Sequence, residues 1–295
     1  MRIIITGAGG QLGRLVTERL LQRHPGRDLI LVTRQPEAIS GLADRGASVR
    51  FGDFDEPDTL DEAFRGGERL LLISTMSLGR RVDQHRAAIL AARRARVGRI
   101  VYTSMINPVP GHPIGLWVDE HRQTEDALRD AELAWTVLRN GYYAESLVDD
   151  LLIAFRSGRL VTNHGGGRVA FVSRADCAAV AAETLLDDRH AGNIYDVTGP
   201  AALDMRAVAA IGAQLSGRPI EAIEIDDAAA AGRLVEAGLA EPLVKFVVSL
   251  GVAVRNGYYA QVSTTVRDLT GREASPLRDV LARELALAAE ARPTG

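Results

Sequence analysis

The chain has 295 residues, of which 46% are hydrophobic and 25% charged, and its net charge at pH 7 is −3. This length suits one large domain or two modest ones, and the slightly acidic balance gives no basic face for nucleic acid. The longest apolar run, residues 243–254, contains Lys245 and is too short to cross a membrane. We therefore predict a soluble protein with neither nucleic acid nor membrane as a partner.

The chain contains a single cysteine, Cys177, which excludes an internal disulfide and fits a reducing compartment. It lies in an Ala-rich helical pattern, so we interpret it as a buried structural thiol. The N-terminus runs directly into a predicted strand, which leaves no room for a signal peptide. We expect a cytoplasmic location, and we predict no bound metal.

Short β-branched or leucine-rich runs alternate with helical patterns through the first two thirds of the chain. Continuous apolar runs are typical of strands that are buried on both faces of a parallel sheet. The predicted strands are 2–6, 29–33, 48–52, 69–74, 99–104, 134–139 and 191–199, and the helical segments between them include 12–23, 57–64, 83–95 and 122–131. This alternation predicts an α/β fold with a Rossmann-type, doubly wound parallel sheet.

The pattern changes near residue 200, after which the chain is mainly helical, with Ala- and Leu-rich amphipathic stretches. We predict a dinucleotide-binding core of residues 1–140, to which residues 171–199 return. Residues 141–170 and 200–295 are predicted to form a smaller substrate lobe. The hexapeptide RNGYYA occurs twice, at 139–144 and 255–260, and we interpret the second copy as chance or as a surface loop.

The segment ITGAGGQLG places three glycines in a G-x-x-G-x-x-G spacing between the first strand and the first helix. The first glycine permits a tight turn, the second lets the backbone approach a pyrophosphate, and the third lets the helix pack closely on the strand. The helix N-terminus offers free N–H groups and a partial positive charge to phosphates. We therefore predict a dinucleotide site that consists of Gly7, Gly10, Gln11, Leu12 and Gly13.

Arg34 follows the second strand, where an NAD site usually has an acidic residue for the ribose 2′-hydroxyl. A guanidinium can hold a 2′-phosphate through two hydrogen bonds, so the predicted cofactor is NADPH, with NADH as a less favoured alternative. We expect Asp53 and Phe54, after the third strand, to meet the adenine. Ser74 and Thr75, after the fourth strand, are expected to face the cofactor.

Nucleotide-dependent reductases often carry a Tyr with a Lys four residues later, and the Lys lowers the pKa of the Tyr. In this chain Trp117 and His121 hold that spacing, within the segment GLWVDEHR. The only lysine is Lys245, and Glu241 stands four residues before it, so no Tyr-x-x-x-Lys pair exists in the sequence. The source of the proton that follows hydride transfer is therefore an open question.

Several candidates remain for this proton. His121 could bind the nicotinamide ribose in place of the lysine, could donate a proton, or could be a helix-surface histidine. Tyr142 and Tyr143 offer hydroxyls near the expected nicotinamide, or form aromatic walls of a pocket. Ser104 could hydrogen-bond a carbonyl or cap its strand. A last alternative needs no protein acid, because reduction of a quinone yields a phenolate whose conjugate acid has a pKa of about 10, and water can protonate it.

Several segments, in the same order along the chain, resemble the NmrA-like atypical short-chain dehydrogenases: TGAGGQLGRLV, DEHRQTEDAL, WTVLRNGYY and SRADCAAVAAETL. Within that family the chain is most similar to NAD(P)H:quinone oxidoreductases and triphenylmethane dye reductases, over nearly its whole length. The resemblance implies an NADPH-bound Rossmann core, a C-terminal substrate lobe and reduction of planar, conjugated substrates. It also implies that Asn140, Gly141 and Tyr142 line the nicotinamide side.

We therefore predict an NAD(P)H-dependent reductase that transfers hydride to a quinone or ketone carbonyl of a planar aromatic substrate, with Trp117 and Tyr143 beside that substrate. One alternative is a ketoreductase that tailors aromatic polyketides, for example of the angucyclinone type, in antibiotic biosynthesis. The chain prefers Arg to Lys and is rich in Ala and Gly, which is typical of a GC-rich genome. This composition favours the ketoreductase alternative. A regulator that senses NADP(H) without catalysis is the alternative of another class. We expect a monomer or a homodimer.

Overall fold

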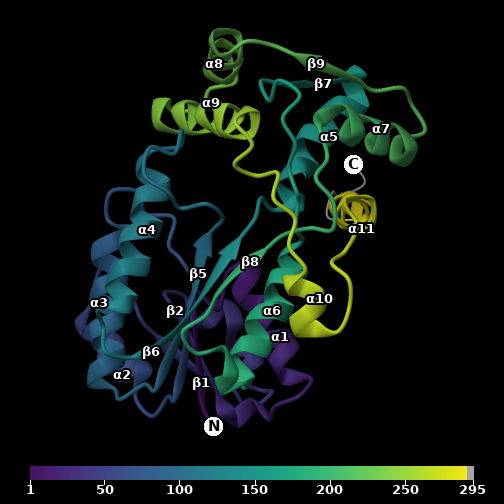
Figure 1. The fold of residues 1–295 in the computed structure, drawn as a ribbon. Coiled ribbons are helices and arrows are strands. Elements are labelled where there is room, and N and C mark those ends of the chain that lie inside the picture. Colours follow the sequence, from purple (N-terminus) through teal and green to yellow (C-terminus); the bar gives the residue numbers. More distant parts are fainter. Residues whose placement is uncertain (291–295) are drawn as a thin grey trace.

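A seven-stranded parallel sheet forms the centre of the molecule in the computed structural model, which describes residues 1–290 (Figure 1). The strand order is β3-β2-β1-β4-β5-β6-β8, and every pairing is parallel. The strands are β1 (Ile3–Thr6), β2 (Leu29–Thr33), β3 (Ser48–Phe51), β4 (Arg69–Leu72), β5 (Arg99–Met105), β6 (Ala134–Asn140) and β8 (Ile194–Val197). The predicted Rossmann-type fold is confirmed.

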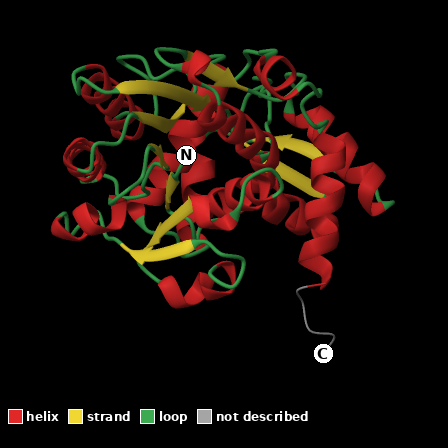
Figure 2. Ribbon diagram, turned by 90° about the horizontal axis from the view of Figure 1, so that it is seen from below, coloured by secondary structure: helices red, strands yellow, loops and turns green. Residues whose placement is uncertain are grey.

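Two layers of helices cover this sheet, and Figure 2 shows helices surrounding the strands. On one face α1 (Gln11–Leu21) packs against α6 (Arg174–Leu186), which also contacts α10 (Thr265–Thr270). The other face is covered by α2 (Asp58–Phe64), α3 (Arg81–Arg94) and α4 (Leu116–Arg129). Successive residues of a strand point to opposite faces. Accordingly Ile3 and Ile5 belong to the core under α1, and Ile4 belongs to the core under α2 and α3.

A second lobe lies beyond the carboxyl ends of the strands (Figure 1). Its helices are α5 (Val148–Ser157), α7 (Met205–Ser216), α8 (Asp227–Glu236), α9 (Glu241–Arg255) and α11 (Leu277–Glu290), and its two parallel strands are β7 (Arg159–Thr162) and β9 (Glu221–Glu224). Short 3₁₀ segments stand elsewhere in the chain at η1 (Gly26–Asp28), η2 (Pro36–Leu42, kinked at Ile39), η3 (Ala144–Leu147) and η4 (Asp188–His190). Among residues 1–290, every helix falls short of the length and apolarity that crossing a membrane requires.

The structure differs from the sequence prediction in three elements. The strand pair β7–β9 was not predicted, because two four-residue strands with exposed ends give no clear alternation. Helix α4 begins at Leu116 rather than at residue 122, so Trp117 and His121 both lie on it. Helix α10 packs on α6 of the core, although the sequence division assigned residues 200–295 to the lobe.

The second RNGYYA copy is exposed at residues 255–257, as its interpretation as a surface loop predicts, but its second tyrosine turns inward. Tyr259 is only 6% exposed, and its carbonyl accepts a hydrogen bond from Ala170 N at 2.9 Å. Its ring centroid lies 5.7 Å from that of Tyr142, which belongs to the first copy. The two copies therefore meet where the lobe contacts the core.

The first turn leaves no room for a side chain at Gly13. A Cβ atom there would lie 2.3 Å from the carbonyl oxygen of Gly7 and 2.8 Å from Ala8 Cα. We expect Gly13→Ala to lower the free energy of unfolding by about 3 kcal/mol, since backbone atoms must move, and to weaken NADPH binding.

The matched control is Gly232→Ala in α8, where a Cβ would meet nothing within 4 Å. A helix interior prefers Ala to Gly by up to about 1 kcal/mol, so this variant should be slightly stabilised. Denaturant unfolding of both variants measures the difference. Equal stability of the two would contradict the close approach of α1 to the turn.

Candidate functional site

The carboxyl ends of the parallel strands form one edge of the sheet, and this edge collects most of the predicted site residues. Gly7 follows β1, Arg34 follows β2, Asp53 follows β3, Ser74 follows β4, and Asn140 ends β6. The strand order reverses direction between β1 and β4. Ligands of open α/β sheets bind at such a switch point, outside the carboxyl ends of the strands.

The glycine turn after β1 has the geometry that a pyrophosphate requires. Gly7 has a φ of +61°, a conformation that favours glycine, and its carbonyl accepts a hydrogen bond from Gly10 N at 2.9 Å. Gly10 is the N-cap of α1 and provides no side-chain cap, so the N–H groups of the first helical turn remain available. Gln11 is exposed at the helix start, whereas Leu12 is buried. These residues fit a dinucleotide.

Two arginines lie beside this turn. Arg34 is exposed, and within residues 1–290 its side chain makes no hydrogen bond or ion pair, so its guanidinium is available to a ligand. Arg14 is held in place, since its Nε donates to Gly9 O at 2.9 Å and its Nη2 to Ala38 O at 3.0 Å. The edge between β1 and β2 is therefore positively charged, which fits a 2′-phosphate.

The loops after β3 and β4 carry the other predicted cofactor residues. Asp53 is partly exposed, and its Oδ1 accepts a hydrogen bond from Asp55 N at 3.0 Å. The neighbouring Phe54 ring packs edge-on against His85, with 6.3 Å between centroids. Ser74 N donates to Thr103 Oγ1 at 2.9 Å. The loop after β3 is thus packed on α3, and the loop after β4 is bonded to β5.

Thr75 is connected to α3 rather than left free for a ligand. Its hydroxyl donates to Gln84 Oε1 at 2.7 Å, and its backbone N–H donates to His85 Nε2 at 3.2 Å. The Thr75 carbonyl accepts from Arg81 Nε at 2.7 Å. The position of this residue is thus determined by α3.

At the end of β6 a buried polar atom has no partner in the protein. Asn140 is 5% exposed; its Nδ2 donates to Tyr143 Oη at 3.0 Å, and its Oδ1 has no hydrogen-bond partner within residues 1–290. Buried amide oxygens are usually paired, so an unpaired one at a ligand-binding edge fits a donor on a bound molecule. Gly141 N donates to Val197 O at 2.8 Å, which fixes this backbone to β8.

Tyr142 and Tyr143 point to different parts of the molecule. Tyr142 packs beside Phe171, with 5.3 Å between ring centroids, in the core of the lobe. Tyr143 packs against the core under α1 and α6, with the Arg174 guanidinium 4.8 Å from its ring centroid. Burial raises the pKa of both phenols, so both stay protonated at neutral pH. The two tyrosines do not form one wall.

Trp117 lies where α4 meets the lobe. Its ring centroid is 4.8 Å from that of Phe246 on α9, and the Arg81 guanidinium stacks on it at 4.7 Å. Trp117 therefore connects the core helix α4, the buried arginine of α3 and the lobe. This position borders the side of the molecule on which Tyr142 lies.

Ser104 is buried and its hydroxyl has a defined partner. The hydroxyl donates to Glu125 Oε1 at 2.7 Å. Glu125 is itself buried and accepts two hydrogen bonds from Arg139, at 3.0 and 2.7 Å, and one from Arg129. Since its proton is directed to a carboxylate, Ser104 can accept but not donate a hydrogen bond here without losing that contact.

His121 is buried on the inner face of α4, so its interpretation as a helix-surface histidine is wrong. It is 7% exposed, and its Nδ1 lies 2.7 Å from Tyr102 Oη on β5. Burial, and then the nearby charges of Arg81 and His85, lower the pKa of His121 well below its usual value. The ring is therefore neutral at physiological pH.

Sequence reasoning missed Arg81, His85 and Tyr102, which surround His121. Arg81 and His85 are in a charged helical segment that is typical of a solvated face, and Tyr102 is within an apolar strand. Nothing local in the sequence marks them as buried neighbours of α4. The only available signal was their position, since Arg81 and His85 lie at the start of α3 and Tyr102 lies in the middle of β5.

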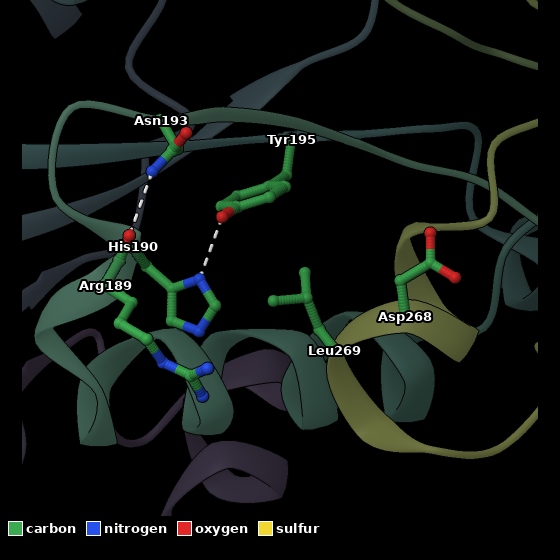
Figure 3. Close-up of a pocket in the computed structure, with 6 residues that line it drawn as sticks. All are labelled: Arg189, His190, Asn193, Tyr195, Asp268 and Leu269. Carbon is green, nitrogen blue, oxygen red and sulfur yellow. Dashed lines mark hydrogen bonds between the residues drawn. The ribbon is translucent and has the colours of Figure 1, made fainter.

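A cavity of about 310 Å³ lies elsewhere, at the edge strand β8 (Figure 3). His190 Nδ1 and Tyr195 Oη lie 2.8 Å apart within it. The cavity is lined by Arg189, His190, Asn193, Tyr195, Asp268 and Leu269, none of which was predicted as a site residue. Residues of η4, which precedes β8, line the cavity. The cavity therefore lies near the amino end of β8, away from the dinucleotide edge.

Comparison with known proteins gives consistent results. Residues 7–188 match the family model described as NAD(P)H-binding. Quinone oxidoreductase 2 of Escherichia coli is 34% identical over 277 residues, which cover 94% of this chain and 96% of that protein. A reductase of Streptomyces griseus, named for (4-alkanoyl-5-oxo-2,5-dihydrofuran-3-yl)methyl phosphate, is 31% identical over 277 residues, 94% of this chain and 95% of that protein.

Two solved structures are also similar. The NADPH complex of the Escherichia coli NADPH-dependent quinone oxidoreductase superposes with a TM-score of 0.91 at 34% identity, covering 95% of this chain and 99% of that one. The NADP(H) complex of Citrobacter triphenylmethane reductase has a TM-score of 0.89 at 31% identity, covering 96% and 100%. The likeness therefore extends over both lobes.

Several histidines make stability depend on pH. Burial lowers the pKa of His85 to about 3, and of His112 and His164 to about 4, from a usual 6.5. Between pH 6.5 and 4 the unfolded chain therefore binds more protons than the folded chain, so the free energy of unfolding falls as the pH decreases. Each ring contributes a slope of up to about 1.4 kcal/mol per pH unit.

Urea unfolding at several pH values between neutrality and pH 5 measures this slope. His164→Gln should reduce the slope by the contribution of one histidine ring. A free energy of unfolding that stays constant or rises as the pH falls would contradict the buried, neutral histidines.

Proposed function

Since this chain belongs to the NAD(P)H-binding family and full-length relatives such as quinone oxidoreductase 2 of Escherichia coli are oxidoreductases, we propose that it is an NADPH-dependent reductase of quinones or other planar conjugated carbonyl compounds. Bound NADPH supplies a hydride with its two electrons. The carbonyl oxygen of the substrate takes up negative charge, and one proton completes the hydroquinone or alcohol.

The position of the single lysine supports our choice of quinones and aromatic ketones as the substrate class. Lys245 is on the outside of α9, 74% of its side chain is exposed, and it pairs with Glu241 at 2.6 Å. No lysine is therefore available at the edge of the sheet to lower the pKa of a tyrosine. A phenolate product, whose conjugate acid has a pKa of about 10, tolerates this absence, whereas the alkoxide of a simple ketone does not. This favours quinones and extended aromatic ketones.

The residues have separate roles in this proposal. The glycine turn and the N-terminus of α1 bind the pyrophosphate, Arg34 binds the 2′-phosphate, and Asn140 with Gly141 borders the nicotinamide. Tyr142 and Trp117 border the substrate, between the core and the lobe of residues 141–170 and 200–295. We further propose that the protein acts in the cytoplasm, as a monomer or homodimer.

The Streptomyces relative favours a second candidate substrate. The substrate in its name is an oxo-dihydrofuran phosphate rather than a quinone, so reductases of this type extend to streptomycete small molecules. A ketoreductase that acts on an aromatic polyketide therefore stays the second candidate, with the same residues in the same roles.

Oxidation of NADPH, followed at 340 nm, tests the function. We expect turnover with menadione, and slower or no turnover with a simple aliphatic ketone, because its alkoxide needs a strong proton donor. A polycyclic aromatic ketone tests the second candidate in the same assay. Saturable binding of NADPH without oxidation by any acceptor would instead identify a sensor and reject the reductase.

Arg34→Ala should weaken NADPH binding by roughly 10- to 100-fold, the effect of losing a charge-assisted contact, and should change NADH binding little. Arg218→Ala is the matched control, since Arg218 is exposed in the lobe, between α7 and β9. Fluorescence titration with both nucleotides gives the two dissociation constants. An equal loss for NADPH and NADH would reject the phosphate-binding role.

A further inference from the structure

A chain of buried side chains connects the loop after β4 to His121. Thr75 N donates to His85 Nε2 at 3.2 Å, and His85 Nδ1 lies 3.0 Å from Thr124 Oγ1. Tyr102 Oη, next to these groups, lies 2.7 Å from His121 Nδ1. His85, Tyr102 and Thr124 have no exposed surface. Water therefore cannot complete any of these hydrogen bonds, and each proton must have a partner within the chain.

The backbone N–H of Thr75 determines which atoms of His85 and Thr124 carry protons. The backbone N–H of Thr75 can only donate, so His85 Nε2 accepts and His85, whose pKa is far below neutral, carries its proton on Nδ1. That proton is donated to Thr124 Oγ1. The Thr124 hydroxyl gives its own proton to Glu120 O at 2.8 Å.

The proton of Tyr102 has one acceptor by the same reasoning. Burial raises the pKa of this phenol, so it stays protonated. The hydrogen bonds of the nearby Thr124 hydroxyl run to His85 and Glu120, and none within residues 1–290 joins it to Tyr102 Oη. The remaining partner of Tyr102 Oη is His121 Nδ1. An unpaired buried hydroxyl would cost about 1–3 kcal/mol, so the phenol donates to Nδ1.

A neutral imidazole that accepts at Nδ1 carries its hydrogen on Nε2. Within residues 1–290, His121 Nε2 has no hydrogen-bond partner, and it is not among the buried unpaired atoms, so it keeps some accessible surface. His121 is one helical turn after Trp117, which borders the proposed substrate side.

We propose that Tyr102 is a positioning residue that fixes His121 as the Nε2–H tautomer, so that this N–H is offered to an acceptor oxygen at the reaction site. The acceptor is the reacting oxygen of the substrate or a ribose hydroxyl of the cofactor. The proposal rests on the reductase function given above. In this proposal His121 occupies the place of the missing lysine, and Tyr102 orients the His121 ring.

The charges around His121 keep this N–H group uncharged. Arg81 is 1% exposed and pairs with Glu120 at 3.2 Å. The titratable groups that act on His121 are Arg81 and His85 from α3 and Tyr102 from β5, whereas Glu120 and Glu125 from α4 act on the Tyr102 phenol. His121 therefore stays neutral at physiological pH, and it acts as a hydrogen-bond donor to developing negative charge rather than as an acid.

The ¹⁵N spectrum of histidine-labelled protein tests the tautomer directly, because the protonated and bare ring nitrogens have well separated shifts. The signal of His121 is assigned by its loss in His121→Gln. We expect a protonated Nε2 and a bare Nδ1, with no titration around the usual histidine pKa of about 6.5. In Tyr102→Phe the two tautomers should become mixed. A wild-type His121 that is protonated on Nδ1, or that titrates in this range, would overturn the proposal.

Kinetics of Tyr102→Phe give the second readout. If the acceptor is the substrate oxygen, kcat falls by about 10-fold or more while the dissociation constant of NADPH is unchanged. If the acceptor is a ribose hydroxyl, the NADPH dissociation constant rises instead. Unchanged kcat and unchanged NADPH affinity would reject the proposal.

Tyr195→Phe is the matched control, because it removes the same phenol from the equivalent contact with His190 in the cavity of Figure 3, and it should leave both constants unchanged. If Tyr102→Phe does not fold, the wild-type spectrum alone decides. If the wild type binds NADPH but reduces nothing, the reductase function fails, and the tautomer of His121 still tests the role of Tyr102.

Discussion

The close approach of α1 to the turn after β1 is the constraint on which the candidate site depends. Only a residue without a Cβ fits at Gly13, against the carbonyl of Gly7. This contact directs the open N-terminus of α1 at the edge of the sheet where the strand order reverses. Every other group assigned to the cofactor lies on a loop whose position follows from the parallel strands below it.

A buried ion pair fixes the neighbouring region. Arg81 binds the carbonyls of Thr75 and Trp117 and one oxygen of Glu120, whose other oxygen accepts from Gly79 N at 2.8 Å. Buried pairs of this kind are weak evidence for stability, because desolvation offsets their attraction. Their effect here is geometric: the loop after β4 and the start of α4 are held in one arrangement, on which the surroundings of His121 depend.

The sequence was sufficient for features that local patterns determine. The fold class, the cofactor and the family resemblance are confirmed, since buried parallel strands and a glycine turn leave clear local patterns. It was insufficient where contacts join distant segments. In the sequence Tyr102 cannot be distinguished from the apolar residues of its strand. Its hydroxyl gains a partner only because α4 packs against the strand and brings His121 to it. The contact between Tyr142 and Tyr259, far apart in the chain, was equally invisible.

The scarcity of lysine has a practical consequence. Apart from the amino terminus, an amine-reactive reagent has one place to attach, Lys245, on the outer side of α9. The next residue, Phe246, contacts Trp117 where the two lobes meet. A fluorophore coupled there would sit close to an intrinsic tryptophan without altering the glycine turn, so energy transfer between the two would report the separation of α9 from α4.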